Sequence, residues 1–290
     1  MLLYRYFPCT VLPTKDGSYN FDALDTLRQA HLKTSRISSY NDPFEYRFKG
    51  NENMSEADAL EMYVRIVSRP GYLERNKTTD PAIKTSNDLI MKILEDQKSA
   101  ARIKKTVLDT RDQRVDDLIS VNDKNYRVVA FSEVKISPID EVIMWSHYAN
   151  KHQGIRIGFE FPDDPIHGPR IERIQYDNER VYLDDKLMDE DEGEFQKQLL
   201  LCMTRKSKAW EYEKEFRLMT SVQRCRAGED GEEYFLEFDR HWIKFVDFGL
   251  RCKTENIRLI AELVKADYPH AVSRMAKFHK SEYALEFHLF

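Results

Sequence analysis

Alternating apolar and polar positions predict β-strands at many places along the chain. Period-two alternation is typical of strands that bury one face against a core. The segments with this pattern are LLYRYF (2–7), YRVVAFSE (126–133), IRIGFEF (155–161), RIQY (173–176), YFLEF (234–238), IKFVDFGL (243–250) and two terminal stretches, 271–278 and 284–290. Their number and spacing favour a sheet made mostly of antiparallel strands.

Helical patterns occur between these strands. Asn20 is expected to cap a helix, and Ser137 is expected to cap another because Pro138 suits a first helical position. Further helices are predicted across 194–210 and from Thr254 to about residue 266. Since helices and strands do not alternate strictly, the pattern predicts an α+β fold with a mixed, mostly antiparallel sheet, flanking helices and a helical insertion.

The segment at about 52–122 has a different texture from the rest of the chain. It carries many charges, few aromatic residues and apolar positions at helical spacing, such as Ala57, Leu60 and Val64. We therefore expect a single α+β domain over residues 1–290, interrupted by a helical insertion at about 52–122.

Composition narrows the class of protein. With 41% hydrophobic and 12% aromatic residues, the chain can build a packed core. The net charge is −5 and basic residues are not massed in one segment, so the electrostatic footprint of a general nucleic-acid binder is absent.

Cysteine usage and the N-terminus indicate where the protein works. The four cysteines are scattered without a CxxC motif or a histidine at metal-ligand spacing, so no metal site is predicted and a reduced, cytoplasmic chain is expected. MLLYRYFPCT does not resemble a signal peptide, and no apolar stretch is long enough for a membrane span, so no membrane partner is expected.

The stretch AWEYEKEFRLMTS (209–221) combines dense charge with a strand-like second half. If that half forms a strand, Glu213, Glu215 and Arg217 share one face, and Leu218 faces the core. Two interpretations follow. The charges either form ion pairs across a wet sheet face or make the polar floor of a site.

Two other segments carry candidate chemistry. In NDPFE, Asn41 and Asp42 are expected to hold a turn, Phe44 to enter the core and Glu45 to close a salt bridge. In MWSHYANKHQG, His147 is a candidate acid or base because its ordinary pKa is near neutrality, although a histidine beside aromatic residues also suits a structural role.

Several of these segments, in this order, resemble a known family. The segments are LYRY, SSYNDPFE, FSE, MWSHYANKHQGIRIGFEF, YEKEFRL and VDFGL, and together they resemble the bacterial domain of unknown function 2971 family. Because that family is largely uncharacterised, the resemblance implies an architecture more than a chemistry.

The order of motifs is also similar, more weakly, to that of ADP-ribosyltransferases. Those enzymes carry an Arg or His on the first strand, a Ser-containing segment on the second and a Glu, often as Glu-x-Glu, on a late strand. The matching positions are Arg5, then Ser35, Ser38 or Ser39, then Glu213 and Glu215. The similarity implies a split sheet, NAD as substrate and a nucleic-acid or protein acceptor, in a toxin or anti-phage setting.

That chemistry assigns a role to each candidate. Cleavage of the nicotinamide–ribose bond passes through an oxocarbenium-like state, which Glu215 would stabilise while holding the ribose hydroxyl. Glu213 would orient or deprotonate the acceptor, and Arg5 would bind phosphate. Tyr40 or Tyr148 would stack on a ring, and the neighbouring Asn41 would line the same pocket.

Two other classes of function remain open. One is a nuclease or other hydrolase, with or without a metal, that uses Glu45, Glu215 and His147. The other is a binding module without catalysis, in which the insertion at about 52–122 offers a surface to a protein or nucleic acid.

Overall fold

The computed structural model describes residues 1–12, 20–47, 54–68, 99–163, 169–182, 192–229 and 231–289, with Thr85, Asp88 and Met91. The chain forms two compact units. The first contains Met1–Arg47, Asn122–Arg180 and Leu200–Phe290, and the second contains Phe48–Val121 and Val181–Leu199. The segment predicted as an insertion lies in the second unit apart from its last residue.

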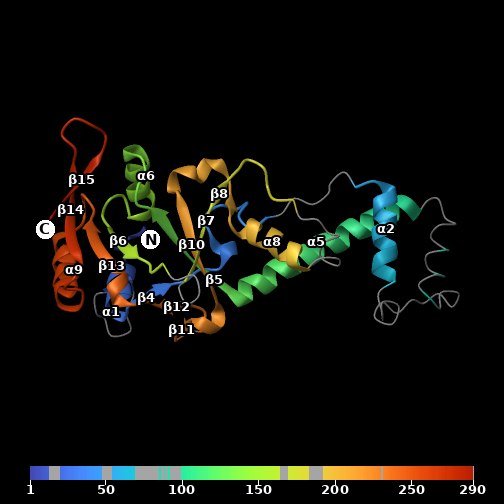
Figure 1. The fold of residues 1–290 in the computed structure, drawn as a ribbon, viewed down its shortest axis with the longest axis horizontal. Helices are drawn as coiled ribbons and strands as arrows, with labels where there is room; N and C mark the ends of the chain where they lie inside the picture. The colour runs from blue at the N-terminus through green and yellow to red at the C-terminus, as the bar shows by residue number, and fades with distance from the viewer. Residues whose placement is uncertain are drawn as a thin grey trace. The chain divides into compact units, whose positions relative to one another are not determined.

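An eight-stranded sheet organises the first unit (Figure 1), in the order β15-β14-β13-β6-β1-β5-β10-β7. Its strands β13 and β14 are parallel, and its other neighbouring pairs are antiparallel. The predicted α+β fold with a mixed, mostly antiparallel sheet is thus confirmed. The strands are β1 Leu2–Phe7, β5 Tyr126–Glu133, β6 Ile155–Glu160, β7 Arg170–Arg173, β10 Glu215–Ser221, β13 Ile243–Phe248, β14 Val272–Phe278 and β15 Leu285–Leu289.

Helices and three small sheets complete the described part of the chain. The helices are α1 Asp22–Gln29, α2 Glu56–Val67, α5 Ser99–Asn125, α6 Pro138–Tyr148, α8 Glu192–Met203, α9 Thr254–Asp267 and the 3₁₀ helices η1 Ile37–Ser39, η2 Lys208–Glu213, η3 Val222–Arg224 and η4 Arg240–Trp242. The small sheets pair β11 Arg226–Ala227 with β12 Tyr234–Glu237 and β4 His31–Lys33, β2 Val11–Leu12 with β3 Asn20–Phe21, and β8 Gln175–Tyr176 with β9 Arg205–Lys206. In this part of the chain, no helix is long and apolar enough to cross a bilayer.

Alternation along the strands gives the large sheet two apolar faces. Ile157 and Phe159 of β6 belong to the main core, together with side chains of α1 and α9 such as Leu24 and Ile260. A smaller cluster joins Tyr4 and Tyr6 of β1 to Met144 and Trp145 of α6. Both faces of the central strands are therefore covered, and β1 contributes side chains to each.

The strands β1 and β5 pair over only a short length. Their ladder consists of Leu3 opposite Glu133 and Tyr4 opposite Ser132, whereas β5 stays paired with β10 from Tyr126 to Ser132. Beyond Tyr4 the carbonyl oxygen of Ala130 instead accepts a hydrogen bond from Nη1 of Arg5, at 2.9 Å. A guanidinium thus stands where a backbone ladder would otherwise continue.

Three local predictions have clear outcomes. Ser137 caps α6, with its hydroxyl accepting a hydrogen bond from the backbone N–H of Asp140, as predicted. Asn20 does not cap α1, because it lies in β3 and Phe21 is the N-terminal flanking residue. Phe44 is 63% exposed rather than in the core, and the neighbouring Tyr46 is buried at 2% instead.

The helix predicted across 194–210 is shorter in the structure. It ends at Met203, and the chain then forms β9, whose Lys206 pairs in parallel with Tyr176 of β8. Helical spacing alone did not indicate this stop, because the pairing partner lies far away in the sequence. As a result, the ammonium group of Lys206 lies within hydrogen-bond distance of Glu215, the first residue of β10.

Candidate active site

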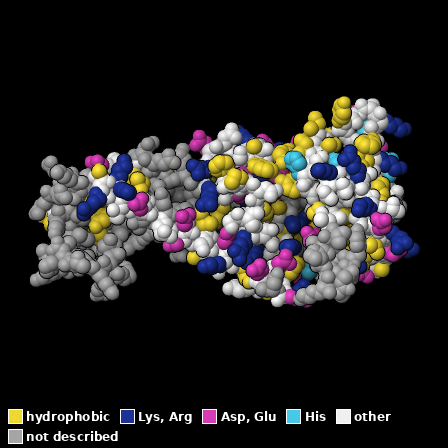
Figure 2. Space-filling model, turned by 180° about the vertical axis from the view of Figure 1, so that it is seen from behind, with side chains coloured by type: hydrophobic (Ala, Val, Ile, Leu, Met, Phe, Trp, Pro, Cys, Tyr) yellow, Lys and Arg dark blue, Asp and Glu magenta, His cyan; other side chains and the backbone are white. Residues whose placement is uncertain are grey.

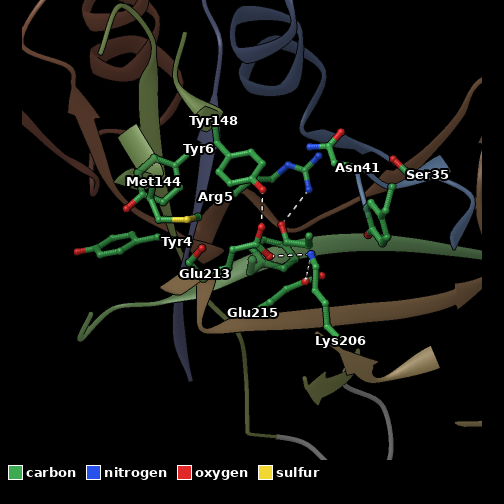
Figure 3. A pocket seen from close by; sticks show the side chains of 14 residues that line it. Tyr4, Arg5, Tyr6, Ser35, Asn41, Met144, Tyr148, Lys206, Glu213 and Glu215 are labelled. Atoms are coloured by element: carbon green, nitrogen blue, oxygen red, sulfur yellow. Dashed lines mark hydrogen bonds and ion pairs between the residues drawn. The ribbon is translucent and has the colours of Figure 1, made fainter. Parts of the chain in front are cut away.

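A cavity of about 200 Å³ lies where β1 and β5 diverge (Figure 3). Aromatic side chains and Met144 form much of its wall, and charged side chains form its floor. The lining residues are Tyr4, Arg5, Tyr6, Ser35, Tyr40, Asn41, Ala130, Phe131, Ser132, Met144, Tyr148, Lys206, Glu213 and Glu215. These side chains come from β1, β5, α6, β9, the end of η2, the start of β10 and the residues flanking η1.

Lys206 is the centre of the charged floor. Its ammonium group donates to Glu213 Oε2 at 2.7 Å and to Glu215 Oε2 at 3.1 Å. The hydroxyl of Tyr148 donates to the other oxygen of Glu213, as the dashed line in Figure 3 shows. Since both glutamates are only 4% exposed, these bonds hold two carboxylates side by side out of bulk water.

Arg217 extends the network beneath the cavity. Its Nε donates to Glu215 Oε1 at 2.7 Å, Nη1 donates to the carbonyl of Met203 at 2.7 Å, and Nη2 is paired with Glu45. The side chain of Arg217 is fully buried. The ion pair predicted for Glu45 is therefore present, and it fixes the loop after η1 to β10.

The local backbone explains how both glutamates reach one ammonium group. Glu213 ends η2, and Lys214 adopts a left-handed conformation with φ of 44° before β10 begins at Glu215. The prediction that Glu213 lies on the same strand as Glu215 is therefore wrong. The turn at Lys214 nevertheless brings Glu213 alongside Glu215, and Leu218 faces the core as predicted.

Burial and charge shift the ionisation of the floor. Burial raises the pKa of Glu215 to about 7, against the opposing charge of Lys206. Burial lowers the pKa of Lys206, but the charges of Glu215 and Glu213 outweigh it and hold that pKa above its ordinary value. Lys206 is thus a fixed cation at neutral pH, whereas Glu215 exchanges its proton in the physiological range.

Two polar groups of the cavity wall keep unused hydrogen-bonding capacity. The Nε of Arg5 and the hydroxyl of Tyr40 are buried and have no partner among the described residues. Burial raises the pKa of Tyr40 to about 12, so its hydroxyl keeps its proton at neutral pH. Burial lowers the pKa of Arg5. Buried donors without partners are costly, and a ligand with an acceptor group would satisfy them.

Seven of the ten candidate residues line this cavity. They are Arg5, Ser35, Tyr40, Asn41, Tyr148, Glu213 and Glu215. The other three do not: Ser38 bonds to Asp123, Ser39 donates to the carbonyl of Arg36, and His147 is exposed with its Nδ1 3.1 Å from the hydroxyl of Tyr212. Of the three residues that the hydrolase hypothesis uses, Glu45 and Glu215 both bond to the guanidinium of Arg217, whereas His147 does not line the cavity.

Lys206 is the main residue of the site that sequence reasoning missed. The helical spacing of 194–210 predicts a helix at this position, and the segment TRKSK does not single out one lysine. Tyr4, Tyr6 and Met144 were recognised only as parts of motifs, although they form the apolar wall. The flanking tyrosines of LYRYF were the available signal, since aromatic residues beside a strand arginine suit a pocket wall.

One family model matches part of the chain. Residues 144–218 match DUF2971, a family of proteins of unknown function. The DUF2971 resemblance is thus confirmed over this segment, which supplies Met144, Tyr148, Lys206, Glu213 and Glu215 to the cavity. No curated protein and no solved structure matched the chain.

Proposed function

We propose that the cavity binds the nicotinamide–ribose end of NAD and that the protein transfers ADP-ribose to a nucleic acid or a protein. The observation that carries this proposal is the convergence of Arg5 with Glu213 and Glu215 in one aromatic cavity. An ADP-ribosyltransferase needs a cation for phosphate, a carboxylate for the ribose and an aromatic wall for nicotinamide. The four cysteines are free thiols, which suits the reducing cytoplasm in which such an enzyme would work.

The proposed reaction breaks one bond and makes one. The bond between ribose C1′ and the nicotinamide nitrogen breaks, and its electron pair leaves with nicotinamide. A nucleophilic oxygen or nitrogen of the acceptor then bonds to C1′, and its proton passes to Glu213. The ionised carboxylate of Glu215 holds the ribose hydroxyl and stabilises the positive charge that develops on the sugar.

The size and the bonding of the cavity suit this arrangement. A volume of about 200 Å³ is below the usual range for whole cofactor sites, so the cavity would hold one ring and its ribose, with the adjacent phosphate at Arg5 and the rest of NAD outside. A carboxylate offers about four lone-pair positions, and Glu215 uses three of them on Arg217 and Lys206. One position remains for a hydroxyl of the substrate.

The hydrolase alternative has less support from the carboxylates. Glu45, Glu213 and Glu215 already bond to Arg217 or Lys206, and the described residues contain no group of three or more ligands placed to hold a metal ion. Cleavage of RNA or DNA that needs a divalent cation and is indifferent to NAD would favour this alternative instead.

Binding of NAD is the first test. Isothermal calorimetry of the folded protein should detect NAD, and Arg5→Met should weaken the binding about tenfold or more because a charge-assisted hydrogen bond to phosphate is lost. Arg36→Met is the matched control, since Arg36 is exposed and does not line the cavity. A well-folded wild-type protein that binds no NAD overturns the proposed function.

The ionisation of Glu215 gives the reaction a defined pH dependence. Because the proposed role needs the ionised carboxylate and burial raises its pKa to about 7, NAD turnover should rise as the pH increases through about 7. Lys206 lowers this pKa, so Lys206→Met should move the rise to higher pH. The measurement is nicotinamide release between pH 5.5 and 9, and an unmoved profile in the variant would argue against this role for Glu215.

A further inference from the structure

The large sheet ends at an edge strand with an unusual sequence. Among the described residues, β14 is the strand that pairs with β15, so one side of β15 faces away from the sheet. The register with β14 runs without a bulge, and β15 contains no proline. Proteins usually protect such edges with charges, prolines or bulges. The sequence of β15 is Leu-Glu-Phe-His-Leu, and its last residue, Leu289, is 81% exposed.

The register shows which backbone groups of β15 point away from β14. The N–H of His279 bonds to the carbonyl of Ala284 at 3.0 Å, and Lys277 lies opposite Glu286. Hydrogen-bonded and non-bonded pairs alternate along an antiparallel ladder, so Glu286 and His288 bond to β14. The N–H and C=O groups of Leu285, Phe287 and Leu289 therefore point outward, where no strand of the described part of the chain pairs with them.

This outward edge is complementary to itself. If two copies of β15 pair antiparallel with Phe287 on the two-fold axis, Leu285 of each copy lies opposite Leu289 of the other. Glu286 then lies opposite His288 of the other copy, which places an acid beside a base at both ends. Each of the three outward-facing residues lies opposite an outward-facing residue of the other copy, so every outward N–H and C=O group of one strand has a partner on the other.

The opposite edge of the same sheet lacks this property. β7 has the sequence Arg-Ile-Glu-Arg, and Arg170 and Arg173 are exposed. The N–H of Ile174 bonds to the carbonyl of Glu215, so the outward-facing residues of β7 are Ile171 and Arg173. A two-fold pairing that uses both of them centres on Glu172, which places Glu172 opposite Glu172 of the other copy and Ile171 opposite Arg173. Like charges directly opposite each other destabilise a strand pair. The two edges thus differ in the way expected if one is built to pair and the other to be protected.

We propose that β15 is a docking edge for a second copy of this chain. Two sheets join through β15 into one continuous sheet, and Leu285, Phe287 and Leu289 of both copies form a shared apolar row. Phe287 already stacks on Trp145 of α6, at 6.1 Å between ring centroids. The row therefore continues the apolar cluster between β1 and α6 across the two-fold axis, and a closed two-fold contact limits the assembly to a dimer.

The test is the mass of the full chain in solution, measured by sedimentation equilibrium over a range of concentrations. The wild-type protein should form a species of twice the 34.4 kDa of one chain. Leu289→Pro should abolish that species, because proline lacks the N–H that points outward and does not interrupt the ladder with β14. Phe278→Ser is the matched control, since Phe278 is 75% exposed but lies on β14.

A charge exchange tests the register directly. His288→Glu places like charges opposite each other at both ends of the contact and should weaken dimerisation about tenfold or more. Because Nε2 of His288 also lies 3.0 Å from Glu286 Oε2 of its own chain, the repair is tested between chains. Mixing the His288→Glu protein with the Glu286→Lys protein restores opposite charges only across the contact and should recover a dimer of the two variants. A monomer at all concentrations overturns the proposal. So does a dimer that persists in Leu289→Pro, or a His288→Glu defect that mixing with the Glu286→Lys protein fails to repair.

Discussion

Arg217→Met is expected to lower the free energy of unfolding by about 3–5 kcal/mol, because the substitution leaves buried carboxylates without their cation. In the native protein, the guanidinium bonds to Glu215, Glu45 and the carbonyl of Met203, and its side chain is fully buried. Methionine fills similar space but donates no hydrogen bond. Urea unfolding should show a lower midpoint with an unchanged slope.

Two further variants separate this effect from a simple loss of packing. Arg224→Met, on an exposed residue of η3, should change stability by about 0.5 kcal/mol or less. Adding Glu45→Gln to Arg217→Met should recover part of the loss, because it removes one of the stranded carboxylates. If Arg217→Met resembled the Arg224 control, the buried network would not be what holds the loop after η1 to β10.

The sheet was the part of the structure that the sequence predicted best. The segments 2–7 and 126–133 coincide with β1 and β5, since period-two alternation records directly which side chains are buried. The start of α6 was equally accurate, because Ser137 and Pro138 act on the backbone next to them. Each of these features is decided by residues close together in the sequence.

The composition of the site was harder to predict because it depends on distant contacts. Lys206 enters the floor only because β9 pairs with β8, a contact that helical spacing in 194–210 does not reveal. Ser38 and His147 fitted a family pattern, but η1 and α6 orient their side chains toward Asp123 and Tyr212. A motif fixes which residue types are available, while the fold decides which of them meet.

The two interpretations of the stretch at 209–221 are compatible. Arg217 and Lys206 neutralise Glu45, Glu213 and Glu215 in an ion-pair network, as the first interpretation expected, but the network is buried and the sheet face that carries it is not wet. The same network holds the two cavity-lining glutamates in fixed positions with restricted access to water. Pre-organised charges of this kind are what stabilisation of a developing cation needs, so the same arrangement that neutralises the carboxylates also suits the role proposed for Glu215.

Glu215→Gln is expected to reduce NAD turnover by about 10²–10³-fold while NAD affinity changes little. Glutamine keeps the size of the side chain and a carbonyl oxygen for the ribose hydroxyl, but it has no negative charge to stabilise the oxocarbenium-like state. The loss should therefore appear in kcat rather than in KM. Release of nicotinamide under saturating NAD measures it, and circular dichroism of the variant verifies that it is folded.

Glu211→Gln is the matched control, because Glu211 lies on η2 close to Glu213 but is exposed and does not line the cavity. It should turn over NAD at the wild-type rate. Glu213→Gln should affect transfer to an acceptor more than the release of nicotinamide in the acceptor's absence, since Glu213 is proposed to take the acceptor's proton. Equal turnover by wild type and Glu215→Gln would remove Glu215 from the reaction, and the convergence of the floor residues would then have only the structural role that Arg217→Met measures.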